Sequence, residues 1–149
     1  MVYRLYVETV KQGNDIGWAY AFYNHQDFMV YKRFGKAEGA DEEQVILEVS
    51  ATALTYFERS IRRRYYDEHF STRIDEDYVT LFTHYPEIAK VAEKCKSDDA
   101  HSIGFIGDDK ALWEALVPFF AQKTMMFENS ADEKFIAQGQ ELAVQGLTK

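Results

Sequence analysis

The pattern of hydrophobic and polar residues near the start of the chain predicts three consecutive strands. Apolar and aromatic residues dominate the segments 3–9, 17–23 and 28–34. The short segments between them are rich in Gly, Asn, Asp and Gln, which suit tight turns. Apolar runs joined by short turns favour an antiparallel meander, so this region is expected to form the centre of the fold.

After the third strand, the apolar residues change to helical spacing. Asp41 is suited to cap a helix, and Glu42 and Glu43 favour the positive end of the helix dipole. The pattern predicts a long helix that runs to about Tyr65. Its apolar stripe includes Ile46, Val49, Ala53, Phe57 and Ile61.

The rest of the chain alternates between strand and helix patterns. A strand followed at once by a helix indicates an α/β unit. Pro86 suits the first position of a helix, whereas Pro118 removes a hydrogen-bond donor near the end of another. The predicted segments are a strand at 78–84, a helix to Cys95, a helix at 111–117, a strand at 124–128, and a last helix capped at 129–130.

Length and composition are those of one domain that covers residues 1–149. Such a chain buries about two thirds of its unfolded surface. Apolar residues make up 46% of the chain and aromatic residues 15%, so the core needs neither disulfides nor a metal.

The cysteine content, the amino terminus and the length of the apolar runs predict the cellular location of the protein. Cys95 is the single cysteine, the amino terminus lacks a signal-peptide pattern, and no apolar run approaches about 18 residues. These features predict a protein of the reducing cytoplasm with no membrane partner. The net charge of −8 repels nucleic acid unless cations gather on one face.

Three short motifs occur where a known family has them. Residues 8–14 contain an acid, four intervening residues and then Gly-Asn, residues 17–20 read Gly-Trp-Ala-Tyr, and residues 111–113 end in Leu-Trp. Together with the order of the predicted elements, they resemble the ribonuclease H fold, the type 1 family in particular. The resemblance implies a five-stranded mixed sheet with helices on both faces.

The resemblance also implies a site. Members of the family cleave the RNA strand of RNA/DNA hybrids with two Mg²⁺ ions held by four carboxylates. The matching positions here are Glu8, Ile46, His84 and Asp132. Glu48 lies about 200° around the helix from Ile46, which turns it towards water. Because two divalent ions need strongly negative ligation, we expect a protein with no cofactor and without ordinary ribonuclease H activity, or with Mg²⁺ or Mn²⁺ if it is active.

Glu8, His84 and Asp132 are the candidate catalytic and metal-binding residues. If they converge, one imidazole and two carboxylates suit a single Mn²⁺ or Zn²⁺ better than a pair of Mg²⁺ ions. The commoner role of such residues at strand ends is to be solvated or hydrogen-bonded.

Arg59, Arg62 and Arg63 are the candidate nucleic-acid contacts. With Arg64 they surround most of a helical turn, so the alternative is a solvated helix end whose positive charges complement the dipole.

Three classes of function remain open. The first is a domain that binds nucleic acid or protein without catalysis. The second is a divergent Mn²⁺-dependent nuclease that uses Glu8, Asp132 and a neighbour such as Glu48. The third is a protein-interaction module that presents the aromatic third strand or the edge of the meander.

Overall fold

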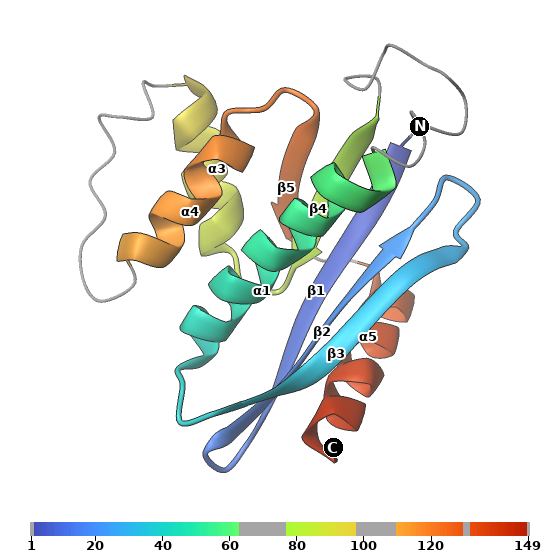
Figure 1. Cartoon of the computed structure of the whole chain (residues 1–149), viewed down its shortest axis with the longest axis vertical. Helices are drawn as coiled ribbons and strands as arrows, with labels where there is room; N and C mark the ends of the chain where they lie inside the picture. Colours follow the sequence, from blue (N-terminus) through green and yellow to red (C-terminus); the bar gives the residue numbers. More distant parts are fainter. Residues whose placement is uncertain (1, 63–76, 98–109, 130–131, 149) are drawn as a thin grey trace.

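A single five-stranded mixed sheet forms the centre of the protein in the computed structural model (Figure 1). The structure describes residues 2–62, 77–97, 110–129 and 132–148. The strands are β1 (Val2–Gln12), β2 (Asp15–Tyr23), β3 (Met29–Glu38), β4 (Tyr78–Thr83) and β5 (Met125–Asn129). The helices are α1 (Glu42–Tyr56), its continuation η1 (Phe57–Arg62), α3 (Glu87–Ser97), α4 (Lys110–Phe120) and α5 (Glu133–Leu147).

The strand order is β3-β2-β1-β4-β5, which confirms the predicted meander and the predicted mixed sheet. β1, β2 and β3 pair antiparallel, whereas β4 pairs parallel with both β1 and β5. In the β1–β4 register, Val7 lies opposite Thr83. The next residue of β1, Glu8, and the first residue after β4, His84, therefore lie beside each other where this pairing ends.

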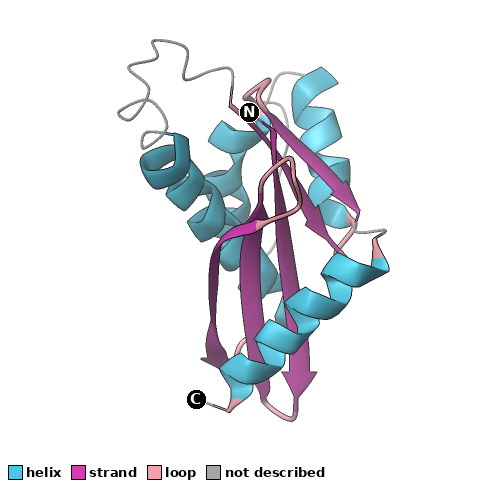
Figure 2. Ribbon diagram, turned by 90° about the vertical axis from the view of Figure 1, so that its right-hand side faces the viewer, coloured by secondary structure: helices cyan, strands magenta, loops and turns pink. Residues whose placement is uncertain are grey.

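Helices cover both faces of the sheet, as predicted. Figure 1 shows α1 and α4 on the face towards the viewer, and Figure 2 shows α5 crossing the sheet on its own. The larger hydrophobic core lies on the side of α1, α3 and α4, and a smaller one lies under α5. Side chains therefore alternate along β1 between the two cores, which is the period of a strand covered on both faces.

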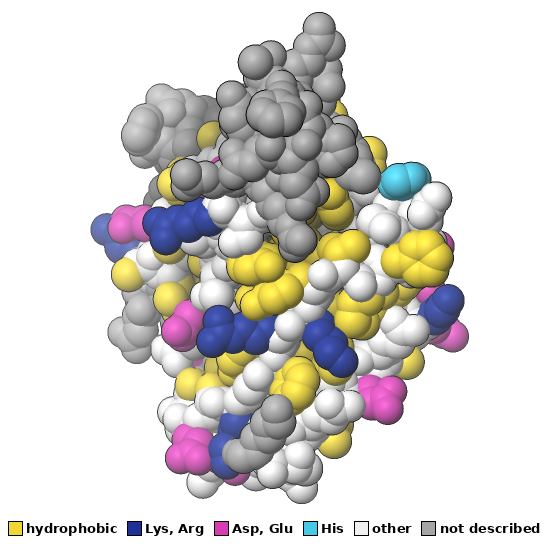
Figure 3. Space-filling view, turned by 45° about the vertical axis from the view of Figure 1, so that its right-hand side comes forward, with side chains coloured by type: hydrophobic (Ala, Val, Ile, Leu, Met, Phe, Trp, Pro, Cys, Tyr) yellow, Lys and Arg dark blue, Asp and Glu magenta, His cyan; other side chains and the backbone are white. Residues whose placement is uncertain are grey.

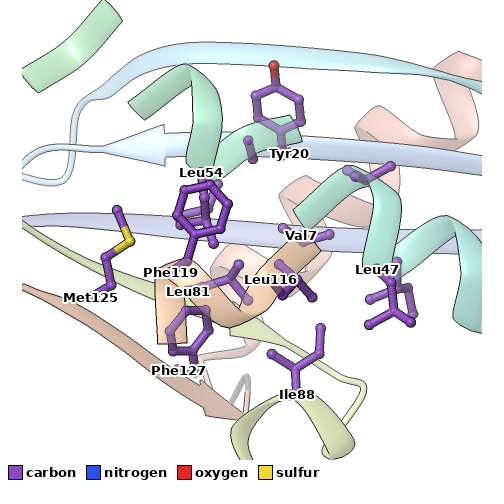
Figure 4. Packing of buried hydrophobic residues seen from close by; sticks show 14 of the residues in the cluster. Val7, Tyr20, Leu47, Leu54, Leu81, Ile88, Leu116, Phe119, Met125 and Phe127 are labelled. Atoms are coloured by element: carbon purple, nitrogen blue, oxygen red, sulfur yellow. The ribbon is translucent and has the colours of Figure 1, made fainter. Parts of the chain in front are cut away.

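The larger core is built from aliphatic side chains of several elements (Figure 4). Leu47 and Leu54 of α1, Leu81 of β4, Ile88 of α3 and Leu116 of α4 are each completely buried. Burial of each such side chain stabilises the fold by about 1.5–3 kcal/mol. This packing fixes the position of α1 over the sheet.

Glycines allow α5 to lie directly on the meander. A Cβ atom at Gly17 would lie 2.1 Å from the carbonyl oxygen of Ala143, and one at Gly146 would lie 2.2 Å from that of Gly35. A Cβ atom at Gly139 would lie 2.7 Å from Cγ of Glu8. The backbones of helix and sheet therefore approach more closely than any larger residue permits.

The helix predicted from Asp41 to Tyr65 differs from the one observed. Regular α1 ends at Tyr56, and the chain continues as a π-helix to Arg62, while residues 63–65 lie outside the described part of the chain. The wider turn begins at Phe57, whose buried ring stacks on Phe22. A stripe of apolar residues does not distinguish the two helical forms, because it continues through both.

The predicted start of the last helix was wrong. Asn129 is the final residue of β5, and the helix is capped by Asp132, whose side chain accepts a hydrogen bond from the backbone N–H of Lys134 at 3.1 Å. The reason is that Asn and Asp both suit a cap, and strand pairing in β5 decides between them.

Pro118 does not end its helix. The helix α4 extends through it to Phe120, because the fixed φ angle of proline is compatible with a helix and the cost is one missing hydrogen bond. Within the described residues, no helix has the length and apolar character needed to cross a membrane.

Candidate functional site

Glu8 and His84 form the centre of a cluster where the pairing of β1 with β4 ends, with Glu8 inside β1 and His84 directly after β4. Nδ1 of His84 lies 2.7 Å from Oε2 of Glu8. The Glu8 side chain is fully buried, whereas that of His84 is 39% exposed. The parallel register and the contact with Gly139 leave the carboxyl group of Glu8 directed to His84, so these two predicted site residues do come together.

Glu42 completes the cluster from the first turn of α1. Its Oε1 lies 3.3 Å from Nε2 of His84, and the hydroxyl of Thr9 donates a hydrogen bond to the same oxygen at 2.7 Å. Thr9 points to the opposite face of β1 from Glu8, so the two neighbours reach His84 and Glu42 from different sides. We call Glu8, Thr9, Glu42 and His84 the glutamate–histidine cluster.

Sequence reasoning missed the role of Glu42 and treated it only as a favourable charge at a helix start. The available signal was its spacing. Glu42 precedes Ile46 by four residues, which places both on one face of the helix. The face of α1 that carries Ile46 therefore also carries the carboxylate of Glu42, one helical turn nearer to the start of the helix.

The two glutamates stabilise the protonated form of His84. Its pKa is raised above the usual value, chiefly by the hydrogen bond with Glu8. Partial burial opposes this shift, while the charge of Glu8 and the contact with Glu42 add to it. An imidazolium donates from both ring nitrogens, so it matches an acceptor on each side.

We expect the stability of the protein to fall as the pH rises above about 6.5, the ordinary pKa of histidine. The folded protein binds the His84 proton more tightly than the unfolded chain does. The contribution is therefore complete below the unfolded pKa and is lost as the pH rises through the folded one. Urea unfolding of the wild type and of His84→Gln from about pH 6 to about pH 8.5 measures this difference.

The difference in free energy of unfolding between the two proteins should shrink over this interval. A constant difference would contradict a protonated His84, because glutamine does not titrate.

Ile46 and Glu48 lie where the helical spacing placed them. Ile46 is 1% exposed and part of the larger core, so it brings no oxygen to the sheet edge. Glu48 is exposed and lines a cavity between α1 and β3. The structure therefore does not bring Glu48 to Glu8.

Asp132 is also separate from the cluster. Its exposed side chain caps α5. It precedes Gly139, the residue of α5 that contacts Glu8, by seven residues, which is about 10 Å along a helix. Of the three predicted metal-binding residues, the structure joins Glu8 and His84 and leaves Asp132 elsewhere.

The side chains present do not fit a pair of divalent metals. Two Mg²⁺ ions need several carboxylate oxygens that converge between them. Here the helix position is an isoleucine, and an oxygen of each clustered glutamate already contacts the imidazole. Among the described residues, no group of three or more His, Cys, Asp or Glu side chains is arranged to hold a metal ion.

Two other predicted surfaces are described only in part. Arg59 is exposed on η1, but the side chain of Arg62 and all of Arg63 lie outside the described region. At the meander edge, three exposed hydrophobic residues precede or begin β3. They are Phe28 (65% exposed), Met29 (38%) and Val30 (47%).

Among the comparisons with known proteins, the comparison of structures finds matches and the comparisons of sequence do not. No family model and no curated protein matches the sequence. The structure of ribonuclease H1 from the halophilic archaeon Halobacterium salinarum NRC-1 superposes with a TM-score of 0.65 at 11% identity, covering 99% of this chain and 98% of that one.

Two further solved structures contain nucleic acid. LC11 ribonuclease H1 in complex with an RNA/DNA hybrid matches with a TM-score of 0.63 at 12% identity, over 98% of this chain and 96% of that one. The foamy viral protease-reverse transcriptase in complex with an RNA/DNA hybrid also gives 0.63 at 12% identity, over 97% of this chain and 19% of the viral one. The strand order, the helices on both faces and these superpositions together show that the chain has a ribonuclease H-like fold.

Proposed function

We propose that this protein is a ribonuclease H-like domain that binds nucleic acid and does not cleave RNA/DNA hybrid by the two-metal route. The observation that carries the proposal is the position of His84 between Glu8 and Glu42. A protonated imidazole in that position is a cation supplied by the chain itself.

Charge balance supports this interpretation. Two divalent ions bring four positive charges, whereas one imidazolium brings one. Two carboxylates suffice to balance it, and the Thr9 hydroxyl provides a further hydrogen bond. A fully buried carboxylate such as Glu8 is costly unless it is paired, so the His84 contact has a structural role that does not require a metal.

Binding of nucleic acid is proposed from the fold and from the charge of β3. Two of the structural neighbours were solved with an RNA/DNA hybrid. In a chain of net charge −8, the edge strand β3 carries Lys32, Arg33 and Lys36. By strand alternation Lys32 and Lys36 lie on one face of β3 and Arg33 on the other, so this edge strand presents positive charge that reduces the repulsion of phosphate on both faces.

The direct test is incubation of labelled RNA/DNA hybrid, duplex and single strands with the protein in Mg²⁺ and in Mn²⁺. We expect no cleavage beyond that of a protein-free control, together with salt-dependent retention of labelled nucleic acid in a filter-binding assay. Cleavage by the wild type that disappears in Glu8→Ala would support the divergent nuclease instead. Absence of any retention would remove the binding half of the proposal.

A second test restores an acid at the strand end. His84→Asp would place three carboxylates together, so we expect it to be less stable than the wild type without metal. Because a bound cation stabilises the folded state, millimolar Mn²⁺ should raise its free energy of unfolding by about 1 kcal/mol or more.

The wild type serves as the control for this metal titration, since the imidazole of His84 already contacts both carboxylates of the cluster. Its midpoint of thermal unfolding should not move in Mn²⁺. A wild-type shift as large as that of His84→Asp would show that the native residues bind the metal.

A further inference from the structure

A second site is formed by the cavity between α1 and the strands β2 and β3. We propose that it binds one nucleotide unit, with the base against the indole of Trp18 and the phosphate at the guanidinium of Arg33. The cavity has a volume of about 280 Å³. Its lining includes Trp18, Tyr20, Arg33, Lys36, Glu48 and Thr52.

Trp18 and Tyr20 give the cavity a fixed aromatic wall. Their rings are parallel to within 8°, with centroids 6.4 Å apart. The indole of Trp18 lies over Gly35 on the neighbouring strand, where a Cβ atom would come within 2.5 Å of it. The half-buried indole of Trp18 can stack on a base of any identity, whereas Tyr20, which is 1% exposed, packs beside it in the core.

Arg33 provides positive charge beside the indole of Trp18, whereas by strand alternation the side chain of Lys36 lies with that of Lys32 on the opposite face of β3. The guanidinium of Arg33 lies near the hydroxyl of Tyr20, whose pKa is raised to about 12, chiefly by burial, so this phenol carries no charge that would repel an anion. Tyr31, whose ring stacks on Tyr56 with centroids 3.9 Å apart, lies near the same hydroxyl.

The charge of the cavity favours an anion. Lys36 lies 3.3 Å from Glu38, but none of the ion pairs between described residues involves Arg33. Among the described residues, the Arg33 guanidinium is therefore the cation of this lining that no carboxylate pairs, and it can accept an anionic group of a ligand as its partner. Figure 3 shows Lys and Arg side chains next to hydrophobic ones near the centre of the face it presents.

The remaining polar groups suit the sugar or the base edge. Glu48 offers carboxylate oxygens to hydroxyl or amino groups. The hydroxyl of Thr52 donates to the backbone oxygen of Glu48 at 2.9 Å and keeps its acceptor capacity. Because the volume is at the lower end for ligand pockets, it suits one nucleotide and not a duplex.

The nucleotide can come from two sources, a free nucleoside monophosphate or a unit of a single strand. Only the second source rests on the proposed nucleic-acid binding. The site is separate from the glutamate–histidine cluster, since Glu42 and Glu48 lie six residues and about 120° apart around α1.

The test uses the fluorescence of Trp18 in full-length Trp113→Phe, which leaves Trp18 as the single tryptophan. The probes are adenosine 5′-monophosphate, adenosine, inorganic phosphate and a 5′-phosphorylated adenosine oligonucleotide. We expect saturable quenching by the monophosphate and weaker binding of adenosine and of phosphate. If Trp113→Phe does not fold, calorimetric titration of the wild type with the same probes replaces it.

Arg33→Gln and Lys32→Gln form a matched pair, because they remove the same charge from neighbouring residues on opposite faces of β3. Arg33→Gln should weaken binding of the monophosphate about tenfold or more, as expected for a charged hydrogen bond, and Lys32→Gln less than about twofold. Tighter binding of the oligonucleotide than of the monophosphate would identify a strand as the ligand, and equal binding a free nucleotide.

The inference would be overturned by absence of saturable binding of both the monophosphate and the oligonucleotide. It would also fail if phosphate alone bound as well as the monophosphate, or if the two glutamine variants behaved alike. Retention of the RNA/DNA hybrid in the filter-binding assay is measured separately. Failure of nucleotide binding at this cavity can therefore be distinguished from failure of the proposed function.

Discussion

Replacement of His84 with alanine is expected to lower the free energy of unfolding by about 2 kcal/mol near neutral pH. The variant leaves the fully buried carboxylate of Glu8 without its imidazole partner. Loss of one member of a fully buried ion pair costs about 3–5 kcal/mol, and the 39% exposure of His84 reduces that value. Urea unfolding followed by circular dichroism measures the change.

His25→Ala is the matched control, because His25 is exposed in the turn between β2 and β3. It should change the free energy of unfolding by less than about 0.5 kcal/mol. Equal effects of the two alanine variants would show that the cluster contributes nothing to stability. His84→Gln, which keeps one hydrogen-bonding side chain, should fall between His84→Ala and the wild type.

Replacement of Gly17 with valine is expected to have the larger effect, a loss of about 4 kcal/mol or more. The first added carbon would lie 2.1 Å from the carbonyl oxygen of Ala143. That atom belongs to the backbone of α5, so relief of the overlap requires the whole helix to move away from the sheet. Thermal unfolding and the yield of folded protein measure the result.

Gly13→Asn tests whether this effect comes from packing. Gly13 has a φ angle of +62° in the turn between β1 and β2, and an added Cβ atom would meet nothing within 4 Å. Asparagine tolerates such a φ angle, so the variant should lose less than about 1 kcal/mol. A loss as large as that of Gly17→Val would mean that chain conformation, and not the contact with α5, makes these glycines sensitive.

The site was only partly predictable, for reasons visible in single residues. Glu8 and His84 were found because they stand at positions that match the family, and the parallel register of β1 and β4, in which Val7 lies opposite Thr83, brings them together. Glu42 was not found, because its partner His84 lies 42 residues away and the contact exists only once α1 packs on the sheet. Asp132 was expected at the site because of its place early in the last helix, yet it caps α5 about two helical turns before Gly139, the residue of α5 that contacts Glu8.

The periodicity and turn residues of the sequence by themselves determined the order of strands and helices and the faces of α1, because both act over short distances, and the family resemblance implied the mixed sheet. The sequence also determined that Ile46 and His84 stand at two of the four positions for which the resemblance implies carboxylates. Only the tertiary structure decided that Glu42 turns the Glu8–His84 pair into a cluster, and that Trp18, Arg33 and Glu48 line one cavity. Both arrangements depend on how closely α1 packs against the sheet, a quantity set by the shape of the buried side chains and not by the local pattern.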